Sequence, residues 1–319
     1  MNVLFLVQKH QRIQLDTLYD GIGEHVDMDI RWLSSDEQRK LSRYFKRSVD
    51  TARYDRIIFL LRFKKEIRQV AFIRTVPNIV ILEHDACQNY YPGTKYEGKF
   101  SRHYHAIPWA RVLVSGYQVA KKLREEGYDA VFVSKGYDDN LLKNLNKERN
   151  IELGFIGSLR HRLYSKRKEF LLSAKDQLGL ELIRTDSGDE YLQALNNIKY
   201  FVGADIGLGE YMIKNFEAMA CGCVLFAWDQ GREENEALGF KDMKNIVLYR
   251  SIEELKSKLD QVRSNGELAK SIATTGQRLV EEQYGFTQIG KKVADAIKPA
   301  LRNHGRVSRF DKLRYMFRR

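Results

Sequence analysis

Short apolar runs alternate with amphipathic stretches along most of this 319-residue sequence. Apolar runs of about four to eight residues are typical of buried strands in parallel sheets, and amphipathic stretches between them are typical of covering helices. The pattern predicts strands over residues 3–7, 28–32, 56–61, 78–82, 111–115, 130–133, 152–156, 180–184, 200–204, 223–227 and 245–249. It predicts helices over 35–51, 64–74, 118–126, 166–178, 190–197, 211–220, 252–264, 267–283 and 287–301. We therefore expect an α/β fold with two parallel sheets.

The length fits about two domains of roughly 150 residues each. A turn-rich stretch at 136–140 and a polar stretch at 143–150 place the boundary between them. We expect an N-terminal domain over 1–140, a C-terminal domain over 141–286, a crossing helix over 287–304 and a basic amphipathic tail over 305–319.

The chain carries 54 Lys and Arg against 42 Asp and Glu, a formal charge of +12. This excess favours an anionic partner, which could be nucleic acid, a phosphate-rich ligand or an acidic membrane surface. Three cysteines form no disulfide framework and suit a reducing cytosol. Since no apolar stretch is long enough to span a bilayer, we expect a cytoplasmic protein that meets the membrane only at its inner surface.

A glycine turn follows the predicted strand 152–156 and leads into a cationic helix start. Backbone N–H groups at such a turn and at a helix N-terminus bind anions. Gly157, Ser158, Arg160, Arg162 and Arg167 could therefore surround a diphosphate. The alternative is an ordinary glycine turn before a solvated basic helix.

A second glycine-rich loop precedes the predicted helix 211–220. The spacing of Glu210, Lys214 and Glu217 would place all three on one helix face, where they suit a ribose or a sugar. The alternative is a Glu–Lys pair on a solvated helix. The apolar residues around Phe216 argue against full exposure, and a buried carboxylate needs a hydrogen-bonding partner.

Residues 216–225, Phe-Glu-Ala-Met-Ala-Cys-Gly-Cys-Val-Leu, resemble the nucleotide-sugar motif of family-4 glycosyltransferases of the GT-B fold. The resemblance is closest to their spore-coat-protein-like, group 1 relatives, and segments 112–138 and 251–287 agree with it. It implies two Rossmann-like domains with a cleft between them and a C-terminal helix that crosses back to the N-terminal domain. It also implies retaining transfer from a nucleotide-activated sugar, with no bound metal and no cofactor.

By the same resemblance, Glu217 would bind the ribose hydroxyls, while Gly157 and one of the arginines would meet the diphosphate. Lys214 would help to neutralise the charge that develops on the leaving group. The donor-binding residues that we expect are Gly157, Ser158, Arg160, Arg162, Arg167, Lys214, Asn215, Phe216 and Glu217.

The sequence departs from the family pattern in the first of two motif glutamates, which in the family are separated by seven intervening residues. Gly209 occupies that slot, and Glu210 comes one residue late, about 100° around a helix. Either Glu210 takes over the sugar-binding role, which we favour, or the role has moved. The family's glycine loop after the first strand is also replaced, by Gln-Lys-His-Gln-Arg at 8–12.

His84 and Asp85 follow a buried strand and resemble the residues of the family's N-terminal domain that contact the donor sugar. The alternative is a His–Asp pair that stabilises a loop. With Glu210 and Lys214 they complete the expected catalytic set. We expect no metal site, because no zinc-type spacing of cysteine and histidine occurs.

Basic residues also gather in the predicted N-terminal domain and in the tail. Together they could face an anionic membrane that holds a lipid-linked acceptor, or they could simply be solvated. The residues are Arg43, Lys46, Arg47, Lys64, Lys65, Arg309, Lys312, Arg314 and Arg318.

These features predict a glycosyltransferase that acts on a membrane-linked glycan of lipopolysaccharide, capsule or teichoic-acid type. A non-catalytic or epimerase-like nucleotide-sugar-binding protein is the alternative, supported by Gly209 at the first glutamate slot. A nucleic-acid partner is not expected, because no recognition helix or aromatic-interleaved basic strand is visible.

Overall fold

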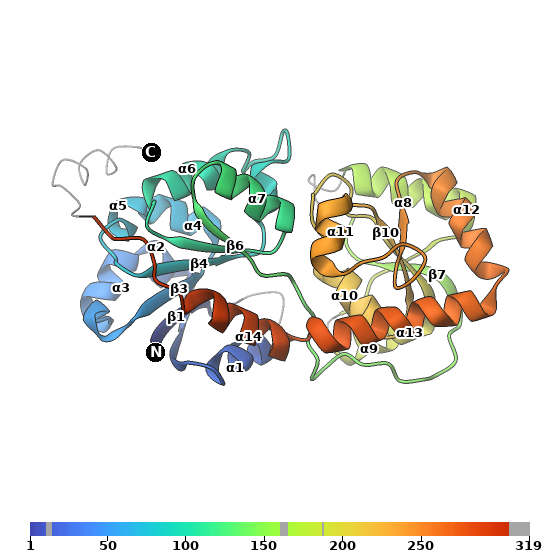
Figure 1. Cartoon of the computed structure of the whole chain (residues 1–319), viewed down its shortest axis with the longest axis horizontal. Coiled ribbons are helices and arrows are strands. Elements are labelled where there is room, and N and C mark those ends of the chain that lie inside the picture. The colour runs from blue at the N-terminus through green and yellow to red at the C-terminus, as the bar shows by residue number, and fades with distance from the viewer. Residues whose placement is uncertain (11–14, 160–164, 187, 306–319) are drawn as a thin grey trace. The chain divides into compact units, whose positions relative to one another are not determined.

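A computed structural model of the chain describes residues 1–10, 15–159, 165–186 and 188–305. The chain divides into two compact units (Figure 1). The N-terminal unit consists of 1–115, 119–133 and the chain from 290 onward, and the C-terminal unit consists of 116–118 and 134–289.

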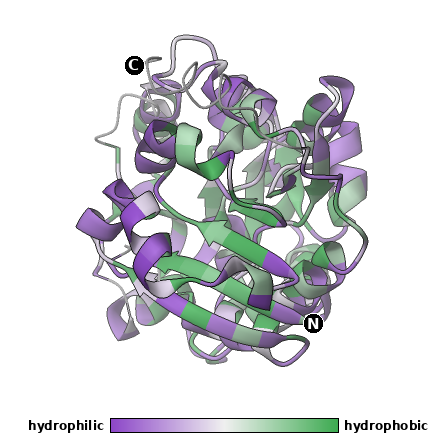
Figure 2. Cartoon of the chain, turned by 90° about the vertical axis from the view of Figure 1, so that its left-hand side faces the viewer, coloured by the Kyte–Doolittle hydropathy of each residue, from purple (hydrophilic) through white to green (hydrophobic). Residues whose placement is uncertain are grey.

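The N-terminal unit is built on a six-stranded parallel sheet with strand order β2-β1-β3-β4-β5-β6. The predicted strands are confirmed: the four inner strands are largely buried, whereas the edge strands β2 and β6 are only partly buried. Residues 3–7 of β1, the strand next to the β2 edge, are fully buried, and Figure 2 shows the hydrophobic colour along strands of this sheet. The strands are β1 (Asn2–Gln8), β2 (Asp27–Leu33), β3 (Arg56–Leu60), β4 (Ile79–Glu83), β5 (Arg111–Val114) and β6 (Asp129–Phe132).

The helices of this unit differ in part from the prediction: 35–51 and 64–74 are divided into shorter pieces, 118–126 begins one residue earlier, and the helices at 16–23 and 99–106 were not expected. They are α1 (Asp16–Gly23), α2 (Ser35–Arg39), α3 (Leu41–Ser48), α4 (Phe63–Glu66), α5 (Val70–Ile73), α6 (Lys99–Ala106) and α7 (Tyr117–Glu125), with 3-10 turns η1 (Thr51–Arg53), η2 (Ile67–Gln69) and η3 (Ala86–Asn89). The predicted helix 35–51 breaks at Lys40, which has φ −126° and ψ 43°. The break allows both Gln38 and Leu41 to be buried. Gln38 donates a 3.0 Å hydrogen bond to the Leu33 carbonyl and accepts one from the Arg62 N–H, so long-range contacts fix the bend.

The C-terminal unit has a five-stranded parallel sheet with strand order β11-β10-β9-β7-β8. Its strands are β7 (Ile151–Ile156), β8 (Glu181–Ile183), β9 (Ile198–Gly203), β10 (Val224–Trp228) and β11 (Val247–Tyr249). Its helices are α8 (Ser165–Leu178), α9 (Asp189–Asn197), α10 (Ile213–Ala220), α11 (Arg232–Leu238), α12 (Ile252–Arg263) and α13 (Gly266–Gln283). Except for α11, every one of them was expected.

The last helix, α14 (Phe286–Ile297), begins in the C-terminal unit and ends in the N-terminal unit, which confirms the predicted crossing. Gly290 packs on α1 so closely that a Cβ there would lie 2.4 Å from the Gly21 carbonyl carbon. Beyond the helix, Arg111 donates hydrogen bonds of 3.0–3.1 Å to the Ala296, Pro299 and Ala300 carbonyls. The N-terminal unit is therefore completed by the last described part of the chain.

Among the described helices, none combines the length and the apolar character needed to cross a bilayer.

Candidate functional site

The glycine turn after β7 lies directly beside α10. The Gly157 N–H donates a 3.1 Å hydrogen bond to the Ile183 carbonyl, which ends the β7–β8 pairing. A methyl group placed on Gly157 would lie 3.6 Å from Cε of Lys214 and only 2.7 Å from the Phe155 ring. Ser158, next in the chain, is exposed. The structure thus brings together the two predicted motifs, whereas Arg160 and Arg162 lie outside the described residues.

Lys214 and Glu217 lie one turn apart on α10 and meet at Tyr191 of α9. The Tyr191 hydroxyl donates a hydrogen bond to Oε2 of Glu217 and accepts one of 3.3 Å from Nζ of Lys214. That ammonium also lies 4.6 Å from the centroid of the Tyr191 ring, within cation–π range. Sequence analysis missed Tyr191, because a single tyrosine 26 residues before Glu217 carries no motif.

Burial shifts the ionisation of all three groups. It raises the pKa of Glu217 above its ordinary value and lowers the pKa of Lys214, although each charge partly offsets the effect on the other. It also holds the pKa of Tyr191 well above its usual range. No described residue donates a hydrogen bond to Oε1 of Glu217, so this carboxylate oxygen keeps its capacity to accept one.

Glu210 lies outside α10, which begins three residues later. The loop before the helix is held by Asp205, whose carboxylate accepts a 2.9 Å hydrogen bond from the Met212 N–H. The prediction that Glu210 shares a helix face with Lys214 and Glu217 is therefore wrong, because a tertiary contact sets where the helix starts.

Glu210 instead forms a buried ion pair with Lys135, at 2.9 Å, whose side chains are 1% and 8% exposed. Glu234 of α11 is close to this pair and fully buried. Its carboxylate accepts hydrogen bonds from the N–H groups of Tyr117, at 3.2 Å, and Gln118, at 2.9 Å. Burial raises the pKa of Glu234 to about 7. Neither Lys135 nor Glu234 was predicted, because the contacts that join them are distant in sequence.

Replacing Glu234 by glutamine is expected to reduce the pH dependence of stability. A folded pKa near 7, against 4.5 for an ordinary glutamate, means that the folded state holds an extra proton between these values. The stabilisation that this proton provides is complete below about pH 4.5 and is lost as the pH rises to about 7. The resulting change in the free energy of unfolding is on the order of 3 kcal/mol at most. Urea unfolding at pH 5 and 7.5 measures it. Equal pH dependence in the wild type and Glu234→Gln would contradict the prediction.

Three of the predicted donor-binding residues have buried side chains that contact other protein groups around the site. Arg167 forms a buried ion pair with Asp205, and Asn215 donates a 2.6 Å hydrogen bond to the same carboxylate. Phe216 is 1% exposed and packs against Tyr284, with ring centroids 5.1 Å apart. Because their side chains are occupied by protein contacts, these residues position the loop and helix and do not line an open surface.

The comparisons with known proteins agree with this architecture. The crystal structure of Anabaena HepE in complex with UDP is similar, with a TM-score of 0.66 and 14% identity over 93% of this chain and 99% of that one. A glycosyltransferase from Rickettsia africae gives a TM-score of 0.63 and 12% identity, over 93% of this chain and 97% of that one. T4 phage BGT in complex with UDP-glucose gives a TM-score of 0.58 and 12% identity, over 94% of this chain and 100% of that one. These likenesses show the GT-B fold.

Residues 140–295, which contain β7, α9 and α10, match a protein family described as glycosyl transferase-like. This match, which spans just under half of the chain, and the GT-B fold together support a glycosyltransferase. No curated protein matches its sequence significantly.

In the N-terminal unit of this glycosyltransferase, His84 and Asp85 lie at the carboxyl end of β4, the partly buried histidine before an exposed aspartate. Asp85 donates a 2.8 Å hydrogen bond from its N–H to Glu83, and the Ser115 hydroxyl donates one of 3.3 Å to the His84 carbonyl. Their catalytic role stays a prediction.

The predicted membrane-facing residues divide into two groups. Arg43, Lys46 and Arg47 on α3 are exposed, as is Lys64, while Lys65 is partly buried. Four lie outside the described residues: Arg309, Lys312, Arg314 and Arg318. Within the described ranges, no three His, Cys, Asp or Glu side chains gather as ligands for a metal ion.

Proposed function

We propose that this glycosyltransferase moves a sugar from a nucleoside diphosphate sugar to a membrane-linked glycan, with retention of configuration and without a bound metal. The motif at 216–225 favours relatives of the family-4, spore-coat-protein-like type. The observation that carries the proposal is the arrangement of Lys214, Tyr191 and Glu217 beside the Gly157 turn.

The donor fits this arrangement by chemistry. The Oε1 oxygen of Glu217 can accept hydrogen bonds from the ribose hydroxyls, since a carboxylate is a strong acceptor for paired O–H groups. Lys214 and the backbone at Gly157 and Ser158 can face the diphosphate. The solved structures of HepE and T4 phage BGT hold UDP or UDP-glucose, which supports a nucleotide-sugar donor of the same class.

The reaction requires the bond between the anomeric carbon and the diphosphate oxygen to break, with the electron pair leaving on the diphosphate. The acceptor hydroxyl oxygen then bonds to the anomeric carbon and releases its proton. Lys214, and the predicted Arg160 and Arg162, would stabilise the charge that develops on the leaving group. These cations would supply the role that a divalent ion plays elsewhere, so transfer should continue in excess EDTA.

The acceptor side is proposed to lie in the N-terminal unit. Arg43, Lys46 and Arg47 are exposed on α3, and each basic residue near an anionic bilayer contributes about 1 kcal/mol of attraction. Three such residues would suffice for peripheral attachment at an anionic inner leaflet, where a lipid-linked glycan is available.

A donor screen tests the proposal. The full chain is incubated with nucleoside diphosphates and their glucose derivatives, and thermal shift, donor hydrolysis and the anomeric configuration of transferred sugar are measured with and without EDTA. We expect one donor to raise the Tm and to be turned over, and Lys214→Ala to lose both effects. Wild-type affinity and turnover in Lys214→Ala would exclude the proposed site.

The second candidate is a nucleotide-sugar-binding protein without transferase activity. Gly209 at the first glutamate slot and the Glu210–Lys135 ion pair favour it, because together they leave no free carboxylate at that slot. It predicts that a donor raises the Tm in the same screen while neither hydrolysis nor transfer occurs.

Replacing Tyr191 by phenylalanine is expected to raise the KM for the donor about 5- to 30-fold and to change kcat less. The variant keeps the ring beside Lys214 but loses the hydroxyl that orients Glu217, a hydrogen bond worth roughly 1–2 kcal/mol to a charged group. Steady-state kinetics measure the effect. Tyr284→Phe removes a buried hydroxyl bonded at 2.8 Å to the Leu238 carbonyl and is the matched control. Similar KM changes in both variants would refute a specific role for Tyr191.

A further inference from the structure

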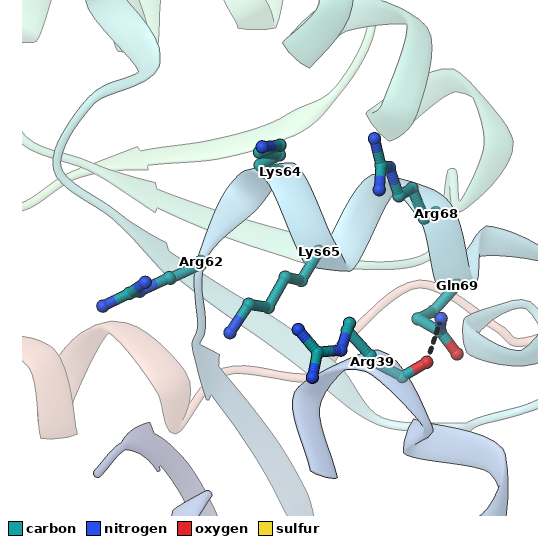
Figure 3. A pocket seen from close by; sticks show the side chains of 6 residues that line it. All are labelled: Arg39, Arg62, Lys64, Lys65, Arg68 and Gln69. Carbon is teal, nitrogen blue, oxygen red and sulfur yellow. Dashed lines mark hydrogen bonds between the residues drawn. The ribbon is translucent and has the colours of Figure 1, made fainter. Parts of the chain in front are cut away.

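A cavity of about 330 Å³ opens in the N-terminal unit between α2 and the segment that follows β3. Figure 3 shows four cations fanning out from residues 62–68, with Arg39 of α2 reaching toward Lys65. We call this cavity the cationic pocket. It is lined by Arg39, Arg62, Lys64, Lys65, Arg68 and Gln69, five cations and one amide.

Four of the five cations have no carboxylate partner among the described residues. Only Arg39 has one, Asp36, at 3.4 Å. Arg62 donates hydrogen bonds to the Gln8 side chain and the His10 carbonyl, and Lys65 donates one of 2.6 Å to the Ser35 hydroxyl, all neutral acceptors. The exposed side chains of Lys64 and Arg68 donate none to a described residue. The positive charge is therefore uncompensated.

The glutamate of the 62–69 segment does not line the cationic pocket. Glu66 is the only carboxylate between residues 62 and 69, and its side chain is 2% exposed and paired with His103 at 2.8 Å. The fold thus removes the one negative charge that could have neutralised the neighbouring cations.

The walls of the pocket are tied together by neutral side chains. The Gln69 amide donates a 2.6 Å hydrogen bond to the Arg39 carbonyl, shown as the dashed line in Figure 3. Gln38 joins α2 to the Arg62 backbone N–H from the buried side. These contacts fix the spacing between α2 and the 62–69 segment, so the cations are held near one another before any ligand arrives.

The crowding has an electrostatic cost that an anion would relieve. The pKa of Lys65 lies below its ordinary value, first because of partial burial and then because of the positive charges of Arg62 and Arg39. A ligand with negative charge would remove this repulsion and gain charge-assisted hydrogen bonds.

We propose that the cationic pocket binds a phosphate or diphosphate group of the acceptor substrate. This step rests on the proposed transferase function, since it assigns the anion to the acceptor. Four uncompensated cations match a group with two or more negative charges better than a single carboxylate, and arginine forks bind phosphate oxygens in pairs. The site is one cavity rather than a groove following a strand, which favours a single phosphate group over nucleic acid.

Equilibrium dialysis of the full chain with labelled inorganic pyrophosphate tests the pocket itself. We expect two classes of site, because the proposed donor site also accepts a diphosphate. Lys65→Gln and Arg68→Gln should each weaken one class about tenfold, the effect of losing one charge-assisted hydrogen bond, and Lys214→Ala should weaken only the other. Arg68→Gln removes an exposed side chain without hydrogen bonds, so its fold is not at risk. Arg102→Gln removes an exposed cation of the same unit outside the pocket and should change neither class.

The proposal would be overturned if Lys65→Gln and Arg68→Gln bound pyrophosphate as tightly as the wild type does. It would also be overturned if Arg102→Gln lost as much affinity as the pocket variants. Donor hydrolysis by wild type separates the two hypotheses, because it needs the donor site alone. If hydrolysis is absent while the pocket variants still lose pyrophosphate, the transferase proposal fails and the anion site remains. Phosphatidylglycerol vesicles and duplex DNA serve as competitors. If vesicles or DNA displace labelled pyrophosphate better than unlabelled pyrophosphate does, and this displacement disappears in Lys65→Gln, the pocket binds a lipid headgroup or nucleic acid. That result would overturn the assignment to the acceptor.

Discussion

Replacing Glu217 by alanine is expected to lower kcat/KM for sugar transfer by about 100-fold or more. The variant loses the proposed hydrogen bonds to the ribose and leaves the Tyr191 hydroxyl, which also accepts from Lys214, without its acceptor. Two charge-assisted hydrogen bonds account for roughly 3 kcal/mol or more, which corresponds to a factor of over a hundred. Initial rates at varied donor concentration measure the loss.

The pH dependence of donor binding tests the role of the Glu217 carboxylate independently. Because burial raises the pKa of Glu217, the group takes up its proton at a higher pH than an ordinary glutamate. Donor affinity should therefore fall as the pH is lowered toward that value, and Glu217→Gln should bind weakly and without this dependence. Glu236→Ala, an exposed carboxylate on α11, is the control. Wild-type affinity in Glu217→Ala would exclude a role in donor binding.

Replacing Gly290 by valine is expected to destabilise the protein by about 3 kcal/mol or more, or to prevent folding. A Cβ at this position would lie 2.4 Å from the Gly21 carbonyl carbon and 2.6 Å from the Ile22 nitrogen, and backbone atoms cannot move aside as a flexible side chain can. Urea unfolding and soluble yield measure the effect.

Gly266→Ala is the matched control, because Gly266 starts α13 and a Cβ there meets nothing within 4 Å. We expect it to be neutral or slightly stabilising, as alanine favours helix more than glycine does. A Gly290→Val variant as stable as Gly266→Ala would show that α14 does not pack on α1 in solution.

The strands could be predicted because their signal is local. Residues 3–7 form an apolar run that only a strand buried on both faces explains, and the same holds for β9 and β10. The break between α2 and α3 could not be predicted, because Gln38 bends the chain through bonds to residues before and after it in sequence. The helix α11 was missed because its sequence, Arg-Glu-Glu-Asn-Glu-Ala-Leu, shows no apolar periodicity.

Only some residues of the candidate site could be predicted from the sequence. Glycine, lysine and glutamate motifs predicted that Gly157, Lys214 and Glu217 would gather, and they do. Glu210 was misplaced because the Asp205 carboxylate, which holds the loop before α10, makes the helix begin only at Ile213. Tyr191 was not predicted, and Lys64 and Lys65 were predicted to face a membrane and not to line a pocket, because the contacts that define these sites join residues far apart in the sequence.

The crossing of α14 has a consequence for biosynthesis. Val293 and Ile297 are fully buried, and Arg56 and Arg111 donate hydrogen bonds to carbonyls in the last turn of the helix. During translation, the six strands of the N-terminal unit are therefore made before the helix that closes their sheet, and this unit cannot be completed until residues 286–297 have been translated. The second half to be made would be the first to finish folding, and a nascent chain stalled near residue 280 would present an incomplete first half to chaperones and proteases.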